Sequence, residues 1–217
     1  MDLQLLAYLQ SYLTERRRNL FERILAERTR HFTVVTEDVY QIHNTSAVMR
    51  SCDVFGIQDL HVIEEQLGKK VDREIAMGAQ KWVDIHRHTD VKLCISKLKE
   101  QGYSIIATTP HDDSQLLADF DVSQKSAFFF GRETEGVSEE VLAAADGSLK
   151  IPMYGFTESL NISVSAAIIL QHVVHRMRSE SVAWQLTEAE KVALTMQWTR
   201  KTIKSVDEIE ARFYAGK

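Results

Sequence analysis

Residues 127–136 read AFFFGRETEG, and this stretch decides the fold that the sequence predicts. Its first four residues are all apolar, which is typical of a strand that is buried on both faces of a sheet. The strand opens into a loop bounded by Gly131 and Gly136, and a helical pattern follows at residues 138–145. A buried strand that leads through such a loop into a helix is typical of α/β proteins, which bind ligands where their parallel strands end.

The same alternation of strands and helices extends in both directions from this stretch. Further strands are predicted at residues 32–36, 60–64, 81–86, 103–109 and 149–151. Further helices are predicted at residues 44–55, 91–99 and 160–177, the first of them capped by Asn44. This order predicts one α/β core with a mostly parallel sheet and helices on both faces.

Both ends of the chain carry helical patterns outside this core. Apolar residues at helical spacing between Leu13 and Leu25 predict an amphipathic N-terminal helix. Thr187 and Glu190 form a capping-box signal for a C-terminal helix that runs towards Tyr214. We therefore divide the chain into a basic N-terminal helical arm, a core and a C-terminal helical extension, at residues 1–31, 32–178 and 179–217.

The length and composition exclude several classes of protein. A chain of 217 residues is long enough for one large domain that needs no disulfide or metal for stability. Nine glycines and two prolines are too few for a collagen-like chain, and two cysteines, Cys52 and Cys94, are too few for a disulfide scaffold. Isolated thiols are typical of a reducing compartment. The first ten residues, MDLQLLAYLQ, do not resemble a signal peptide, and the apolar runs are too short to span a membrane. We therefore predict a cytoplasmic protein without a membrane span.

The net charge of −5 argues mildly against a nucleic-acid partner, but the distribution of charge weakens that argument. Residues 1–31 and residues 172–217 each carry two more basic than acidic residues, whereas residues 32–171 carry a net charge of −9. Six arginines lie between Arg16 and Arg30. Such a cluster can bind phosphates, and it can equally form a solvated helix face balanced by nearby glutamates.

The common ligand motifs of α/β proteins are absent from the sequence. It contains no G-x-G-x-x-G, no P-loop and no G-x-S-x-G, so dinucleotide, P-loop nucleotide and serine-hydrolase sites are unsupported. His86 with His88, and His172 with His175, would each share one face of an element, but neither pair has a third ligand nearby. We therefore expect no metal site.

Three other segments place polar residues at strand ends or helix starts. Residues 43–50 bring Asn44 and Arg50 to the start of a helix, where anions bind. Residues 131–136 and residues 151–163 each follow a strand and lead towards a helix. Taken alone, each segment is equally well explained as an ordinary capped helix or turn.

Taken together and in this order, the three segments resemble the SpoU group of RNA ribose 2′-O-methyltransferases in the SPOUT superfamily. The three motifs of that family match Asn44, Ala47 and Arg50, then Gly131, Glu133 and Gly136, then Ile151, Pro152, Met153, Ser159, Leu160, Asn161 and Ser163. The helical ends further resemble the TrmH type, whose members methylate guanosine 18 in the D-loop of tRNA.

The resemblance implies a C-terminal deep trefoil knot formed by the third motif, a homodimer, and S-adenosylmethionine as the cofactor. It implies methylation of a ribose in RNA, with guanosine 18 of tRNA as the expected target. Ribosomal RNA or another tRNA position is an alternative target, and a non-catalytic RNA-binding protein on the same scaffold is an alternative of another class. The positions implied for cofactor contacts are Thr108, Gly131, Ile151, Met153 and Leu160.

The resemblance also implies catalytic roles for Arg50, Asn44, Glu133, Ser159 and Asn161. A charged Arg50 can bind the phosphate beside the ribose and stabilise negative charge on the 2′ oxygen. A guanidinium stays protonated at neutral pH and is an awkward base, but the sequence leaves both roles open. Asn44 would orient Arg50 or the ribose. Glu133 would hold Asn44 or Asn161, and Ser159 and Asn161 would line the pocket across the dimer interface.

Because the middle of the chain is acidic, a tRNA partner is expected to contact the basic ends. The candidate phosphate contacts are Arg16, Arg17, Arg28, Arg176 and Arg178.

Overall fold

The structure is a computed structural model that describes residues 2–39, 42–64, 77–110 and 114–216. These residues form two compact units. One comprises Thr29–Trp184, and the other combines Met1–Arg28 with Gln185–Lys217. The division into arms and core at residues 31 and 178 stays a prediction. In the described part of the chain, no helix has both the length and the apolar composition that crossing a membrane requires.

The larger unit is built around a seven-stranded sheet in which every described pair of neighbouring strands is parallel. In space the strands follow the order β3-β2-β1-β6-β4-β7-β5. In chain order they are β1 (Phe32–Glu37), β2 (Asp59–Ile63), β3 (Asp84–His88), β4 (Ser104–Thr108), β5 (Gln115–Leu116), β6 (Ser126–Phe130) and β7 (Gly147–Lys150). The predicted α/β class with a parallel sheet is confirmed.

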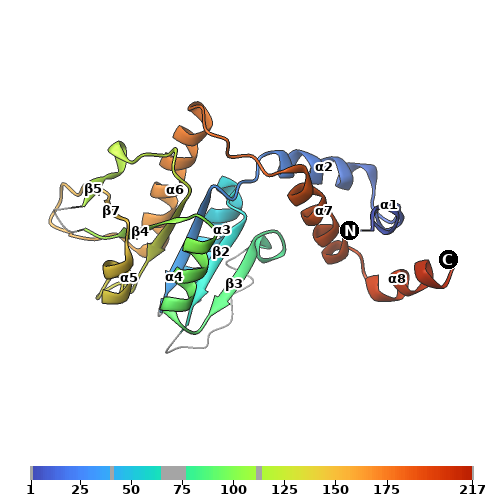
Figure 1. The fold of residues 1–217 in the computed structure, drawn as a ribbon, viewed down its shortest axis with the longest axis horizontal. Coiled ribbons are helices and arrows are strands. Elements are labelled where there is room, and N and C mark those ends of the chain that lie inside the picture. Colours follow the sequence, from blue (N-terminus) through green and yellow to red (C-terminus); the bar gives the residue numbers. More distant parts are fainter. Residues whose placement is uncertain (1, 40–41, 65–76, 111–113, 217) are drawn as a thin grey trace. The chain divides into compact units, whose positions relative to one another are not determined.

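Helices cover both faces of this sheet (Figure 1). They are α3 (Ile42–Phe55), α4 (Val91–Glu100), α5 (Glu139–Ala144) and α6 (Ile162–Ser179), with the single turns η1 (Ala79–Lys81) and η2 (Leu117–Asp119). On the α3 and α6 face, Met49 shares a core with Phe128 of β6. On the α4 and α5 face, Leu98 shares a core with Phe129 of the same strand. The central strand β6 is therefore buried from both sides, as its apolar sequence predicts.

The structure differs from the predictions at the start of α3, at the position of β3 and in the presence of β5. Helix α3 begins at Ile42, so Asn44 lies in its first turn and does not cap it. Strand β3 spans Asp84–His88 and not residues 81–86, because Ala79–Lys81 form the turn η1. Strand β5 was not predicted, since two exposed residues are too few to show a periodic pattern.

The smaller unit is helical and joins the two ends of the chain. Its helices are α1 (Leu3–Gln10), α2 (Glu15–Ala26), α7 (Glu188–Thr202) and α8 (Val206–Ala215). Leu9 of α1, Met196 of α7 and Ile209 of α8 share one buried core. Residues almost 200 positions apart in the sequence therefore stabilise each other within one unit.

The predicted C-terminal helix is divided into α7 and α8, whereas the predicted N-terminal helix corresponds to α2 and is preceded by the unpredicted helix α1. Thr14 accepts a hydrogen bond from the backbone N–H of Arg17 and caps α2, which separates it from α1. Ser205 separates α7 from α8, with a positive φ of 52°. The predicted capping box of Thr187 and Glu190 is confirmed at the start of α7.

Candidate active site

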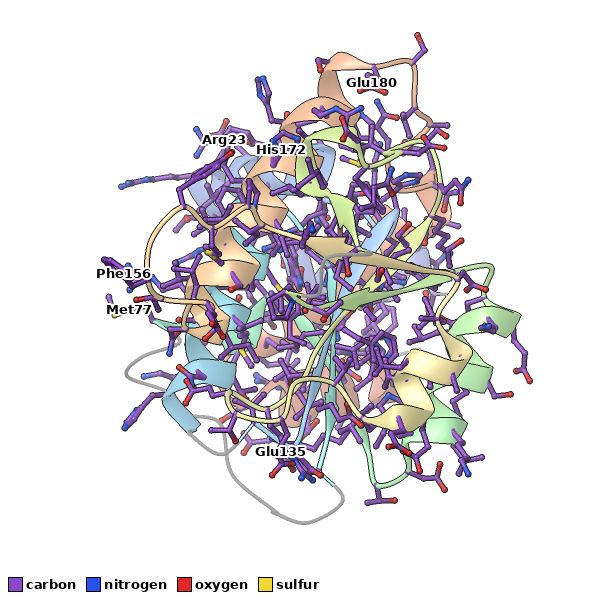
Figure 2. The ribbon with its side chains drawn as sticks, turned by 90° about the vertical axis from the view of Figure 1, so that its left-hand side faces the viewer. Arg23, Met77, Glu135, Phe156, His172 and Glu180 are labelled. Carbon is purple, nitrogen blue, oxygen red and sulfur yellow. The ribbon has the colours of Figure 1, made fainter. Side chains whose placement is uncertain are left out.

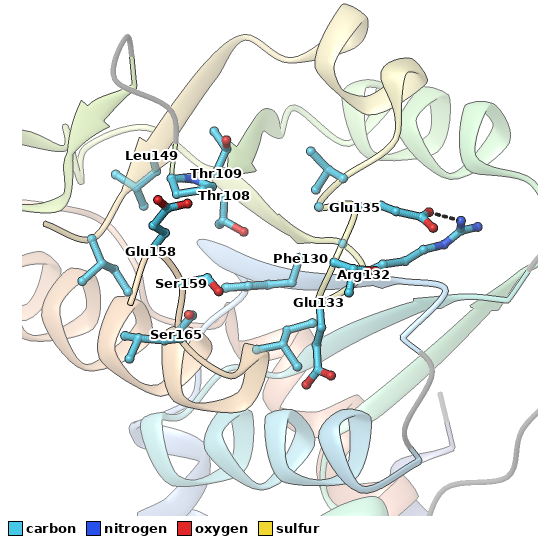
Figure 3. Close-up of a pocket in the computed structure, with 18 of the residues that line it drawn as sticks. Thr108, Thr109, Phe130, Arg132, Glu133, Glu135, Leu149, Glu158, Ser159 and Ser165 are labelled. Atoms are coloured by element: carbon cyan, nitrogen blue, oxygen red, sulfur yellow. Dashed lines mark hydrogen bonds and ion pairs between the residues drawn. The ribbon is translucent and has the colours of Figure 1, made fainter. Parts of the chain in front are cut away.

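A pocket of about 350 Å³ opens where β4, β6 and β7 end (Figure 3). Residues that directly follow these strands form its wall, together with the first turns of α6. The residues proposed for cofactor contacts all line it: Thr108, Gly131, Ile151, Met153 and Leu160. Ser159 and Glu158 line the same wall, just before α6 begins. The carboxyl edge of a parallel sheet is the usual place for such a site.

The three sequence motifs meet beside this pocket through their side chains. Asn44 of α3 donates from Nδ2 to Glu133 Oε1 at 2.8 Å. Asn161, which caps α6, donates from Nδ2 to the same carboxylate oxygen and to Asn44 Oδ1, both at 3.0 Å. In Figure 3, Glu133 points from its loop towards α3. One carboxylate thus joins a helix, a strand-end loop and a second helix start.

This cluster also explains why Asn44 does not cap its own helix. Its side chain is 5% exposed and is used by Glu133 and Asn161, which are 89 and 117 residues away in the sequence. The oxygen of Asn161 accepts the backbone N–H and the hydroxyl of Ser163, so Asn161 performs the capping role on α6. The Asn44 amide and the Asn161 nitrogen therefore hold the motifs together, and the Asn161 oxygen caps α6.

The loop between the two motif glycines is closed by backbone hydrogen bonds. The N–H of Arg132 donates to the oxygen of Gly136 at 2.8 Å, and the N–H of Gly136 donates back to Arg132 at 2.9 Å. Gly136 has a positive φ of 74°, a conformation that favours glycine. A Cβ on Gly131 would lie 2.0 Å from the Gly136 oxygen, so the loop leaves room for hydrogen only.

Two residues at the end of β1, Glu37 and Asp38, hold this loop, and they belong to none of the three sequence motifs. Arg132 donates to Asp38 at 3.0 Å and also pairs with Glu135. Glu37 accepts the backbone N–H of Ser138 at 2.9 Å, at the start of α5. Asp38 is buried, so its ion pair with Arg132 fastens the loop to the sheet. Glu37 and Asp38 are far from this loop in the sequence, so local patterns could not predict the two contacts.

Arg50 occupies a different position from the other proposed catalytic residues. It lies on α3, six residues after Asn44, and its side chain is exposed. It is not among the residues that line the pocket. The structure thus brings Asn44, Glu133, Ser159 and Asn161 to the pocket and its rim, and leaves the Arg50 guanidinium accessible to an incoming molecule.

The arginines proposed for phosphate contacts fall into two groups. Arg16 and Arg178 are exposed and Arg17 is half-buried, and Arg178 lies over the ring of Trp184 at 4.5 Å. Arg28 is 1% exposed and lies over the Trp198 ring at 5.6 Å.

Arg176 also differs from the expectation. It donates to the backbone oxygens of Ala118 and Phe120 and pairs with Glu180. The expectation of phosphate contacts at Arg28 and Arg176 is therefore corrected, because packing and backbone contacts occupy their guanidinium groups.

Comparison with known proteins identifies relatives of this chain. A family profile described as the SpoU rRNA Methylase family matches residues 31–171. The tRNA (guanosine(18)-2′-O)-methyltransferase of Borreliella burgdorferi is 38% identical over 208 residues, which cover 96% of this chain and 95% of that protein. The protein of the same name from Thermus thermophilus is 41% identical over 157 residues, which cover 72% of this chain and 81% of that protein.

A solved structure with a related name shares the fold of this chain. The A. aeolicus TrmH/SpoU tRNA modifying enzyme superposes with a TM-score of 0.80 at 30% identity, covering 88% of this chain and 98% of that one. The family profile spans well over half of the sequence and includes all three motifs that meet at the pocket. The chain belongs to the SpoU methylase family.

Proposed function

We propose that this chain is an S-adenosylmethionine-dependent methyltransferase that acts on the ribose 2′-hydroxyl of guanosine 18 in tRNA. The observation that carries the proposal is the hydrogen-bonded cluster of Asn44, Glu133 and Asn161, which joins the three family motifs beside one pocket. The Borreliella and Thermus relatives are named for this reaction, and the first aligns over 96% of the chain. Since tRNA is the substrate, the activity belongs to the cytoplasm.

The pocket has the properties that a nucleoside-containing cofactor needs. Its volume of about 350 Å³ is within the range of roughly 300–1,000 Å³ for small-molecule sites. Leu149, Ile151 and Leu160 provide an apolar wall for a flat base, and Gly131 exposes backbone to the ligand. S-adenosylmethionine would supply an electrophilic methyl group on a sulfonium sulfur.

The residues of the chain then have to orient the ribose and stabilise charge on its oxygen. We assign charged Arg50 to the phosphate beside the target ribose and to the negative charge that develops on the 2′ oxygen. The hydrogen bonds of the Asn44–Glu133–Asn161 cluster hold the first turn of α3 in place. Because Arg50 lies on the same helix, they also set the direction from which its guanidinium approaches the ribose. Ser159 lines the pocket and is exposed, so an incoming acceptor can reach it. Fixed orientation alone contributes several kcal/mol to such reactions.

We also propose a homodimer, and a trefoil knot in the segment that carries the third motif. Leu160 lies just before α6, and Val164 and Ile168 lie four residues apart on it; each of the three is at least 37% exposed. Phe156, in the loop before α6, is fully exposed and points away from the fold (Figure 2). Apolar side chains grouped at a site in this way are typical of an interface between subunits.

The accessible arginines should account for the salt dependence of tRNA binding. Arg16→Ala and Arg178→Ala should each weaken tRNA binding and lower the slope of log affinity against log salt by about 0.9 per duplex phosphate contact. Arg176→Ala should leave that slope unchanged, because Arg176 is held by backbone oxygens. Fluorescence anisotropy at several salt concentrations measures the slopes. An unchanged slope in both exposed-residue variants would remove Arg16 and Arg178 from the RNA surface.

Glu133 is expected to act as a positioning residue. Glu133→Ala removes the acceptor shared by Asn44 and Asn161 and should lower turnover by about 10-fold, as expected for a lost hydrogen bond to a charged group. Glu133→Gln keeps an oxygen at this place and should restore part of the turnover. The cofactor dissociation constant should change less than turnover in both variants. Glu139→Ala, an exposed glutamate on α5, is the control.

The proposal is tested with tRNA transcripts that differ at one ribose. A transcript with guanosine at position 18 should accept a methyl group, whereas the same transcript with 2′-deoxyguanosine there should not. A 23S rRNA fragment should accept none. Methylation of the deoxy transcript would exclude the 2′-hydroxyl of residue 18 as the acceptor, and preferred methylation of the rRNA fragment would favour the alternative substrate.

A further inference from the structure

Three side chains of the kinds that bind metal ions lie together on the α4 side of the sheet, outside the pocket. It consists of His61 on β2, His88 on β3 and Cys94 on α4. One ring nitrogen of each histidine and the Cys94 sulfur all lie within 4.8 Å of one another. None of the three residues lines the pocket. This cluster therefore needs an explanation separate from the proposed methyl transfer.

The histidine rings are already oriented towards each other. His61 Nδ1 and His88 Nε2 face one another at 3.0 Å, with the rings nearly parallel. Tetrahedral zinc with ordinary bond lengths holds its nitrogen and sulfur ligands roughly 3.3–3.6 Å apart. The histidine nitrogens are slightly closer than that, and no two of the three ligand atoms are more than 4.8 Å apart.

The charges of neighbouring residues act on a cation at this place in opposite directions. Cys94 would bind a metal as the thiolate, so metal binding displaces the proton of its thiol. Lys97 on α4 opposes a cation here, and the Glu37 carboxylate favours one.

We propose that His61, His88 and Cys94 bind one divalent transition metal ion of the zinc type. Two imidazole nitrogens and one thiolate match the ligand preference of zinc, and His88 is only half-buried, so a water molecule can complete four-coordination. Binding releases the Cys94 proton to solvent and involves no change of oxidation state. The ion would fasten the edge strand β3 and helix α4 to β2.

This inference revises the expectation of no metal site. In the sequence, His86 and His88 have no third ligand nearby. The structure brings that third ligand from α4, and it shows His86 bound to Asp59 at 2.8 Å. His86 stacks on His61 with ring centres 4.6 Å apart, so it supports the cluster from the side.

Cobalt(II) is the probe for the test, because its bond to a thiolate gives a charge-transfer absorption. The full-length protein, reduced and freed of metal, should bind one Co²⁺ per chain with this absorption, and Zn²⁺ should displace it. Absence of the absorption in the wild-type protein would overturn the proposal. This outcome does not depend on whether any variant folds, or on activity.

Variants then locate the site. Cys94→Ala should abolish the absorption, and His88→Gln should weaken Co²⁺ binding at least ~10-fold. Cys52→Ala is the matched control, since Cys52 is also a buried thiol but lies in the core on the α3 side. Its spectrum should equal that of the wild type. Absorption that persists in Cys94→Ala, or disappears in Cys52→Ala alone, would overturn the assignment.

Discussion

Replacing Arg50 by alanine is expected to lower turnover at least ~100-fold while the affinity for S-adenosylmethionine stays close to that of the wild type. The side chain is exposed on α3 and lies outside the pocket, so its removal leaves the pocket walls intact. What is lost is a guanidinium that binds the phosphate and stabilises charge on the ribose oxygen. Single-turnover kinetics and a cofactor titration on the same preparation separate the two effects.

Two further variants make this result specific to position 50. Arg50→Lys keeps a positive charge but loses the forked geometry that suits phosphate, so it should recover only part of the turnover. Arg87→Ala, which removes a half-exposed arginine of β3 paired with Glu64, should behave like the wild type. Turnover near the wild-type value in Arg50→Ala would contradict the assigned role.

The second large effect is expected at Gly131. In Gly131→Ala the new Cβ would lie 2.0 Å from the Gly136 oxygen and 2.2 Å from the Val137 nitrogen. Both are backbone atoms, so the loop that lines the pocket has to open. Overpacking of a tight site costs up to about 3 kcal/mol, and we expect cofactor affinity to fall by up to ~100-fold. Equilibrium dialysis measures this directly.

Gly155 provides the matched control for this substitution. It lies in the loop of the third motif, and a Cβ there would meet no atom closer than 4.0 Å. Gly155→Ala should therefore retain cofactor binding. If Gly131→Ala also bound the cofactor normally, the loop between Gly131 and Gly136 would not shape the cofactor site as proposed.

Local sequence was sufficient to predict most of the larger unit. The apolar run of β6 predicted a strand buried on both faces, and this strand lies between β1 and β4 at the centre of the sheet. The motif residues lie at strand ends and helix starts, where local patterns are strong. The residues for which the family resemblance implied cofactor contacts all line one pocket.

Contacts between distant residues could not be predicted in the same way. Asn44 looked like a helix cap because its partners are 89 and 117 residues away. Arg28 looked like a surface charge, but Trp198, 170 residues later, lies under its guanidinium. The parallel pairing of β3 with β2 sets His86 opposite His61 and His88 opposite Ile63, and the local sequence does not show this pairing.

The most direct test of the account is to map the methylated nucleotide after incubation of the purified protein with S-adenosylmethionine and an unmodified mixed tRNA pool. Nuclease digestion with mass spectrometry identifies both the nucleotide and its position. The account predicts 2′-O-methylguanosine at position 18 of the D-loop. A methyl group on a base, a methylated ribose only at other positions, or no methylation at all would contradict it.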